Sequence, residues 1–244
     1  AIRSCLVGSE MCIRDSPSSD NGCKVYMRDG AQLRAPIDEE IDKLIRESEF
    51  PSINLPQGNG TLVNADRGLE EAYCAAITKS LTQQNTKTRI AYTPLHGVAM
   101  RLIQKSFTKA QAGELIPVKT QMVPDADFPT VSFPNPEEHG VMDSVIDLAK
   151  ASNADLALAN DPDGDRLAVA IPTLSGDWRL LSGDEIGALL FNHVARKTSG
   201  NNRKVVTTIV CSKLVSKIAS NHGVEHATTL TGFKWIIPAA YNDS

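Results

Sequence analysis

The sequence predicts an α/β fold made of consecutive units, in which strands are joined by crossover helices. Short apolar segments rich in β-branched residues alternate along the chain with longer segments whose apolar residues recur at helical spacing. Two turns suited to ligands, at residues 94–97 and 161–165, each follow a strand-like segment directly. Because parallel strands collect ligand loops at their carboxyl ends, we expect both turns at such an edge of a sheet.

The size and composition are those of an ordinary folded protein. The 244 residues, 41% of them hydrophobic, can bury one large core or two modest ones. The five cysteines are an odd number and include no CxxC pair. Neither a disulfide framework nor a zinc site is therefore indicated, and a reducing cytoplasm is the expected location.

The charge pattern argues against two classes of partner. With a net charge of −4, 5% aromatic residues and no block of Lys or Arg, the chain lacks an electrostatic footprint for nucleic acid or a membrane surface. No apolar stretch is long enough to span a bilayer, and the first residues lack a signal-peptide core. We expect no nucleic-acid partner, no membrane partner and no obligate protein partner.

The first elements are two helices separated by a loop. Residues 37–45 place Ile37, Ile41, Leu44 and Ile45 on one stripe after Pro36, with acidic residues early, which predicts an amphipathic helix. The stretch 51–67 is rich in Pro, Gly and Asn and is interpreted as a loop or linker, and a helix is expected over 69–82.

A second unit begins with a short buried strand at residues 89–93, which breaks at 94–97 and continues as a helix over 98–109. A strand, a Gly-containing turn and a helix N-terminus can together bind an anion, but an ordinary βα loop fits the spacing equally well. His96 in this turn could donate to a phosphate or cap the helix. The sequence leaves both choices open.

The remaining elements continue the same alternation. In the second unit we expect a strand at 116–118 and 120–123, a helix over 141–150, a strand at 155–160 and a strand at 166–171. In a third unit we expect a helix over 183–196, a strand at 205–210, a helix from a Ser212 cap to 221, a strand at 224–228 and then a loop at 231–235.

The acidic turn carries the strongest chemical signal. Asp161, Asp163 and Asp165 stand at alternate positions after an apolar strand, and oxygen-only ligands with no nearby His or Cys suit Mg²⁺ or Ca²⁺. Arg166 adds a guanidinium that could hold a phosphate oxygen beside the metal. The simpler alternative is a solvated acidic turn. An EF-hand is excluded, because Arg166 stands where that loop needs Gly.

Five segments in this order resemble the α-D-phosphohexomutase superfamily, and most of all its phosphoglucomutase/phosphomannomutase branch. They are DNGCKVY at 20–26, TPLHG at 93–97, DPDGDR at 161–166, GDE at 183–185 and TGFKW at 231–235. The resemblance runs from about Pro17 onward. It implies consecutive mixed-sheet α/β domains, of which this chain carries an incomplete set.

The resemblance also implies an activity and residue roles. The reaction would be an intramolecular phosphoryl transfer on a hexose or pentose phosphate, with a phosphoserine, Mg²⁺ and a sugar bisphosphate activator. Asp161, Asp163 and Asp165 would hold Mg²⁺, and Arg166 would steady the phosphoryl oxygens. The catalytic lysine would be Lys24, and the substrate contacts would be His96 and Lys234.

The resemblance divides the chain into four parts. These are a non-native or disordered leader at 1–16, a remnant of domain I at 17–68, domain II with the metal loop at 69–182, and a partial domain III at 183–244. The family's serine precedes the DNG segment, and counting back from Pro17 places Arg14 at its position. We therefore expect this chain to be inactive as a fragment.

Two alternatives remain. One is a noncatalytic α/β protein that binds Mg²⁺ or a phosphosugar and has lost the serine. A haloacid-dehalogenase-like phosphatase also has an Asp-x-Asp loop, but that loop normally ends the first strand of its domain, whereas Asp161 follows several strands.

Overall fold

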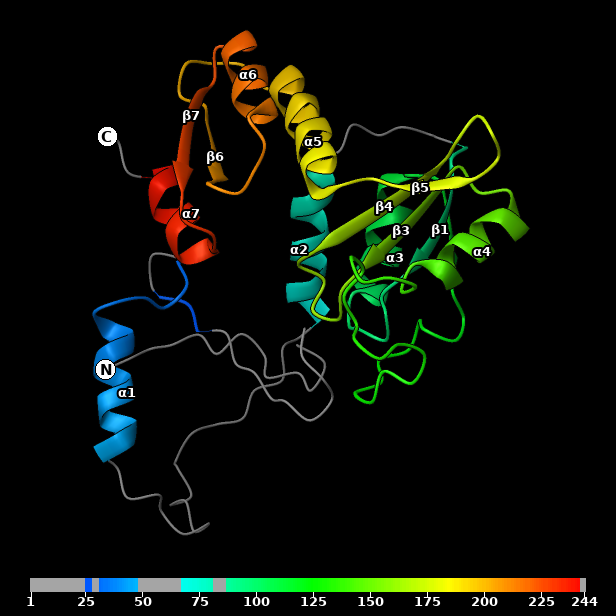
Figure 1. The fold of residues 1–244 in the computed structure, drawn as a ribbon, viewed down its shortest axis with the longest axis horizontal. Helices are drawn as coiled ribbons and strands as arrows, with labels where there is room; N and C mark the ends of the chain where they lie inside the picture. Colours follow the sequence, from blue (N-terminus) through cyan, green and yellow to red (C-terminus); the bar gives the residue numbers. More distant parts are fainter. Residues whose placement is uncertain (1–24, 28–30, 48–66, 81–86, 242–244) are drawn as a thin grey trace. The chain divides into compact units, whose positions relative to one another are not determined.

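The computed structural model describes residues 25–27, 31–47, 67–80 and 87–241 (Figure 1). The chain divides into two compact units. The central unit contains the described residues 67–80 and 87–190, and the terminal unit contains 25–27, 31–47 and 191–241. Among the described residues, no helix is both long and apolar enough to cross a membrane.

The central unit is built on one mixed five-stranded sheet in the order β2-β1-β3-β4-β5. The strands are β1 Arg89–Thr93, β2 Glu114–Pro117, β3 Leu156–Asn160, β4 Leu167–Pro172 and β5 Trp178–Leu180. The first three run parallel, while β4 and β5 are antiparallel to their neighbours. The carboxyl ends of β1 and β3 are adjacent, which confirms the expected placement of the two turns.

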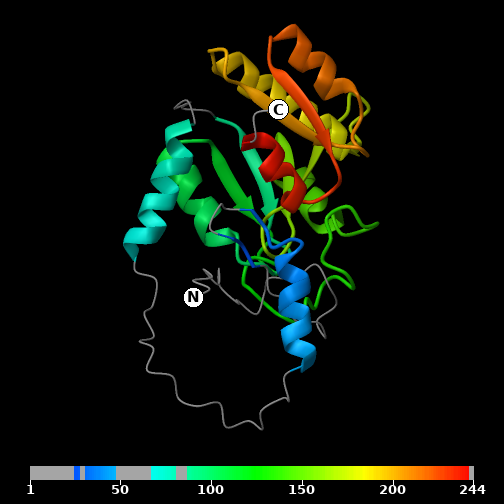
Figure 2. The same ribbon diagram turned by 90° about the vertical axis from the view of Figure 1, so that its left-hand side faces the viewer.

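Helices cover both faces of this sheet. The chain passes from β1 through α3 (Met100–Ala110) to β2, and then back across β1 through α4 (Asp143–Ser152) to β3. Right-handed crossovers in opposite directions put these two helices on opposite faces. Helix α2 (Arg67–Ser80) packs against α3, and Figure 2 shows the two side by side.

A row of alanines forms the sheet face beneath α4. Ala157 pairs with Ala91 on one side and with Ala170 on the other, and Ala159 pairs with Ala168. All five are buried, and they pack with Val145 and Ala149 of α4. Small side chains let the helix approach the strands closely, so the ends of β1 and β3 are held by a well-packed layer.

The terminal unit contains a two-stranded parallel sheet of β6 (Lys204–Thr208) and β7 (Glu225–Thr229). Helix α6 (Leu214–Asn221) forms the crossover between them and buries Val215 and Ala219. The other helices are α1 (Ile37–Glu47) and α7 (Phe233–Tyr241), while α5 (Gly183–Lys197) runs across the boundary between the units. The second and third units of the sequence analysis thus have the predicted βα order.

Two sequence interpretations are wrong. Residues 120–123 form a turn rather than a strand, because the Gln121 amide hydrogen-bonds back to Val118 O and the Gln121 side chain bonds Thr93 at the end of β1 and Thr130. Residues 233–235 begin α7 rather than ending a loop, since the amides of Trp235 and Ile236 bond to Gly232 O. Pro238 lies inside α7, and a proline in that position is a signal against a helix.

Several predictions concern parts of the chain outside the described residues. They are the leader at 1–16, the loop at 51–67 apart from Arg67, which begins α2, and Lys24 in the DNGCKVY segment.

Candidate metal centre

The acidic loop is a closed turn between β3 and β4. The Asn160 side chain donates to Arg166 O at 2.6 Å and accepts from the Tyr92 hydroxyl at 3.0 Å, so the loop is fastened at its base to β1. Gly164 has φ +74° and donates to Asp161 O at 3.0 Å. A residue with a side chain would adopt that backbone only with strain.

The three carboxylates converge on one point. One oxygen from each of Asp161, Asp163 and Asp165 lies within 4.8 Å of the others. Asp161 is buried, Asp163 is half-buried and Asp165 is exposed, so the cluster opens from the protein interior toward solvent. Ligands on opposite sides of a Mg²⁺ ion stand about 4.2 Å apart, so small side-chain movements would bring these oxygens around one ion.

Arg166 orients the innermost carboxylate. Its amide donates to Asp161 Oδ1 at 2.8 Å, its Nε donates to Asp161 Oδ2 at 3.0 Å, and its Nη1 donates to Asn135 Oδ1 at 3.1 Å. Both Asp161 oxygens are thus held in a fixed direction. The Arg166 side chain as a whole is 34% exposed, although its Nη2 atom is buried.

The electrostatics of the loop favour a cation. Burial is the main cause that raises the pKa of Asp161 to about 7; the nearby Asp163 contributes to this rise, and the hydrogen bonds from Arg166 oppose it. One arginine therefore does not fully offset the burial and mutual repulsion of these carboxylates. A divalent cation would do so, and oxygen ligands of this kind suit Mg²⁺.

The turn after β1 presses directly against the acidic loop. Leu95 and His96 have φ of +47° and +61° and bring Gly97 so close to Pro162 that a Cβ on Gly97 would stand 2.2 Å from Pro162 O. The Val98 amide donates to that same oxygen at 2.9 Å. Pro162 lies between two of the carboxylates, so the turn after β1 sets the position of the metal loop.

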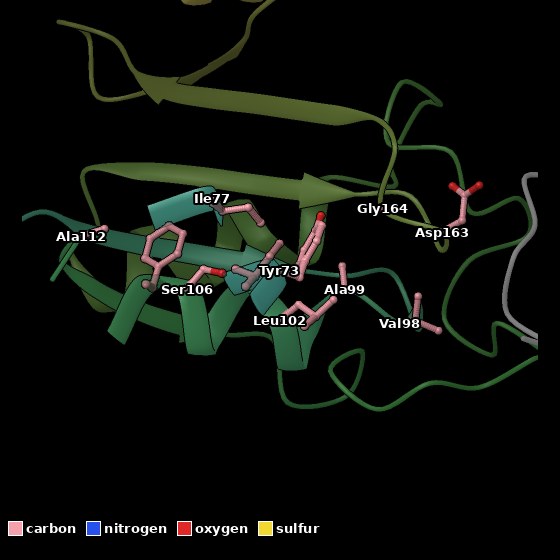
Figure 3. A pocket seen from close by; sticks show the side chains of 11 residues that line it. Tyr73, Ile77, Val98, Ala99, Leu102, Ser106, Ala112, Asp163 and Gly164 are labelled. Atoms are coloured by element: carbon pink, nitrogen blue, oxygen red, sulfur yellow. The ribbon is translucent and has the colours of Figure 1, made fainter. Parts of the chain in front are cut away.

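A cavity of about 290 Å³ borders the acidic loop at Asp163 and Gly164. Apolar side chains of α2 and α3 line most of it, and Figure 3 shows Asp163 at the end opposite Ala112 and Ser106. This apolar lining offers no cluster of charged ligands. The polar chemistry of the site is therefore concentrated on the acidic loop.

His96 is a buried side chain with a clear structural partner. The residue is 2% exposed, and its Nε2 lies 2.8 Å from Thr130 Oγ1. It does not cap α3, which begins at Met100 after Ala99 without a side-chain cap. Its contact with a substrate phosphate stays a prediction.

The pKa of His96 leads to a testable pH effect. Burial lowers this pKa from its ordinary value near 6.5, although Asp125 opposes the shift. The stabilising contribution of the neutral ring is therefore present above about pH 6.5 and is lost as pH falls toward the lower pKa of the folded state. We expect the free-energy difference between wild type and His96→Gln to shrink between pH 8 and pH 5 in chemical denaturation. Parallel profiles would contradict this account.

Lys234 lies in the first turn of α7, in the terminal unit. Its Nζ stands 5.6 Å from the centre of the Trp235 ring, a cation–π arrangement. The predicted contact with a sugar phosphate is untested, and Lys24 lies outside the described residues.

Sequence reasoning missed the residues that support the loop. Tyr92 and Asn160 fasten its base, Asn135 holds Arg166, and Thr130 holds His96. Asn160 is the last residue of β3 and Tyr92 is the second-last residue of the neighbouring strand β1, so a polar residue near the end of a buried strand was the available signal. Asn135 and Thr130 lie in an irregular segment with no comparable pattern.

The sequence profiles of two domains of one known family match this chain. Residues 71–176 match "Phosphoglucomutase/phosphomannomutase, alpha/beta/alpha domain II", and residues 182–243 match "Phosphoglucomutase/phosphomannomutase, alpha/beta/alpha domain III". The first match includes strands β1 to β4 of the sheet and the acidic loop. The second includes α5, β6, α6, β7 and α7.

Individual relatives agree with the profiles. A probable phosphomannomutase of Haemophilus influenzae is 36% identical over 91% of this chain and 46% of its own length. A human phosphopentomutase is 36% identical over 91% of this chain and 39% of its own, and a Staphylococcus aureus phosphoglucomutase is 32% identical over 91% and 41%. The chain therefore spans less than half the length of these relatives.

A solved structure shares the fold. The crystal structure of a phosphoglucomutase/phosphomannomutase family protein from Burkholderia thailandensis superposes with a TM-score of 0.73 at 23% identity. The superposition covers 92% of this chain and 45% of that one.

Proposed function

Since this chain belongs to the phosphoglucomutase/phosphomannomutase family, we propose that it supplies the metal-binding domain, and part of the next domain, of a mutase that moves a phosphoryl group within a sugar phosphate. The observation that carries the proposal is the convergence of Asp161, Asp163 and Asp165 beside Arg166. The names of its relatives support a hexose or pentose phosphate as the substrate.

The chain's own residues would each have a distinct task. Asp161, Asp163 and Asp165 would hold the metal, which when bound neutralises charge on the phosphoryl group during transfer. Arg166 would orient Asp161 and steady the phosphoryl oxygens. Such fixed donors lower the barrier because they need no reorganisation as charge develops.

The remaining assignments are carried by the family resemblance. Lys24 would assist proton transfer near the nucleophile, and Lys234 would bind a substrate phosphate, its charge held beside the Trp235 ring. His96 would lie beneath the site and present at most one ring nitrogen, because Nε2 is engaged by Thr130. The proposed setting is sugar-phosphate metabolism in the cytoplasm, with a sugar bisphosphate as activator.

The other candidate function is a noncatalytic protein that binds Mg²⁺ or a phosphosugar. The observation that favours it is Arg14, which stands where the family's phosphoryl-carrying serine would fall. Ser16, Ser18 and Ser19 are out of register with that position, and misplacing a nucleophile by even about 1 Å can cost a hundredfold in rate.

We expect the chain as given to show little mutase turnover, because no serine stands at the carrier position. A coupled assay with glucose 1-phosphate, a bisphosphate activator and Mg²⁺ measures this, with a full-length phosphoglucomutase as the positive control. The rate should fall at least a hundredfold below the ordinary value of about 10 s⁻¹. A rate near that ordinary value would refute both the noncatalytic alternative and the assignment of Arg14 to the serine position.

A further inference from the structure

We propose that Gln121 is a positioning residue for the metal site, acting through the turn after β1 together with Thr130. The inference rests on the proposed metal site and adds two residues to it. Neither belongs to the acidic loop, and Gln121 follows β2 on the far side of β1 from β3.

Gln121 binds the turn after β1 through both its backbone and its side chain. Its carbonyl accepts from the His96 amide at 3.0 Å, and its Oε1 accepts from the Thr93 hydroxyl at 2.7 Å. Its Nε2 donates to Thr130 Oγ1 at 2.8 Å. Gln121 is 1% exposed and its bond to Thr93 is buried, where an unmade bond is costly, whereas its bond to the exposed Thr130 is part-buried.

The hydrogen bonds form one directional chain. Thr93 Oγ1 accepts from the Leu95 amide at 3.0 Å and donates to Gln121, and Gln121 in turn donates to Thr130. The Thr130 hydroxyl then donates to His96 Nε2 at 2.8 Å when the ring carries its proton on Nδ1. This series of hydrogen bonds encloses Leu95 and His96, the two residues of the turn with left-handed backbone. It therefore stabilises a conformation that costs free energy by itself.

The enclosed turn transmits its position to the carboxylates. Gly97 and Val98 come next in sequence and contact the backbone of Pro162, which is flanked by Asp161 and Asp163. Because there is no free space between Gly97 and Pro162, a shift of the turn must move Pro162 or break the bond from Val98. Either change alters the spacing of the carboxylate oxygens.

The binding affinity of a cation that requires regular coordination geometry should be sensitive to such a shift. Mg²⁺ requires near-octahedral oxygens at about 2.0–2.1 Å, whereas Ca²⁺ accepts irregular sets at about 2.3–2.6 Å. A loosened turn should therefore weaken Mg²⁺ binding more than Ca²⁺ binding. Simple loss of folded protein would weaken both by the same factor.

The test is calorimetric titration of the full chain with each cation. Gln121→Met keeps the length of the side chain and removes its polar atoms, while Thr130→Val removes the hydroxyl and Thr130→Ser keeps it. We expect Gln121→Met and Thr130→Val to lower Mg²⁺ affinity roughly tenfold or more, and Ca²⁺ affinity by less than about threefold. Thr130→Ser should restore binding close to wild type. Thr108→Val, on the exposed side of α3, is the matched control and should change neither affinity.

The outcomes separate this inference from the proposed function. If wild type binds Mg²⁺ but the variants bind both cations as wild type does, or lose both equally, the positioning role is refuted and the metal site stands. If wild type binds neither cation, the metal site itself is wrong, and the positioning role falls with it. Should Gln121→Met fail to fold, the comparison of Thr130→Val with Thr130→Ser decides the question.

Discussion

The Gly97→Ala substitution is expected to destabilise the central unit by about 3 kcal/mol or more. The added Cβ would stand 2.2 Å from the oxygen and 2.3 Å from the Cα of Pro162. Both are backbone atoms, which cannot turn aside as the end of a flexible side chain can. The two loops must separate, and the hydrogen bond from Val98 to Pro162 must lengthen or break.

Gly187→Ala is the matched control for this effect. Gly187 lies within α5, and a Cβ built there meets nothing within 4 Å. Alanine has the higher helix propensity, so this change should be neutral or stabilise by up to about 1 kcal/mol. Urea denaturation of the two variants and wild type measures the difference. Equal midpoints for Gly97→Ala and Gly187→Ala would show that the turn and the metal loop are not in contact as described.

The parts of the fold that follow from local patterns could be predicted from the sequence. Strand β1 was predicted with its observed bounds, and β3 and α5 differ by one residue at one end, because their periodicity and flanking turns are local signals. The parallel arrangement places the ends of β1 and β3 together, so the proximity of the two turns could be inferred as well.

The wrong or missing elements depended on contacts between distant residues. The segment around Gln121 contains β-favouring residues. The Gln121 side chain, however, bonds Thr93 and Thr130, and these long-range hydrogen bonds hold the segment in a turn instead of a strand. Strand β5 is only three residues long and pairs with β4 after a turn, so it produced no periodic signal. In α7 the interior Pro238 conflicts with the apolar spacing that surrounds it.

In the candidate site, too, the features that depend on local sequence could be predicted, and those that depend on contacts between distant residues could not. Asp161, Asp163 and Asp165 lie in one short loop, so the convergence of their carboxylates could be predicted. Local hydrogen bonds, from the Gly164 amide to Asp161 O and from the Asn160 side chain to Arg166 O, close that loop. The hydrogen bond between His96 and Thr130 joins residues far apart in the sequence and could not. No spacing rule links a histidine in a turn after β1 to a threonine in an irregular segment.

Asp163→Asn is expected to lower Mg²⁺ affinity at least tenfold, the second large effect. Asparagine has nearly the same shape as aspartate, so the loop should keep its backbone while one charged ligand is lost. In the absence of metal the change also relieves repulsion between Asp163 and Asp161. The unfolding midpoint of the metal-free variant should therefore equal or exceed that of wild type, which distinguishes loss of a ligand from loss of folding.

Calorimetric titration of Mg²⁺ into wild type, Asp163→Asn and Asp127→Asn tests the central claim most directly. Asp127 is exposed in a second acidic segment and serves as the control for removing one negative charge. With three carboxylates and several retained waters as ligands, wild type and Asp127→Asn should bind alike and weakly, at roughly millimolar Mg²⁺, and Asp163→Asn should bind far less. Equal behaviour of the two variants, or no cation binding by wild type at millimolar Mg²⁺, would contradict the assignment of this loop as the metal site.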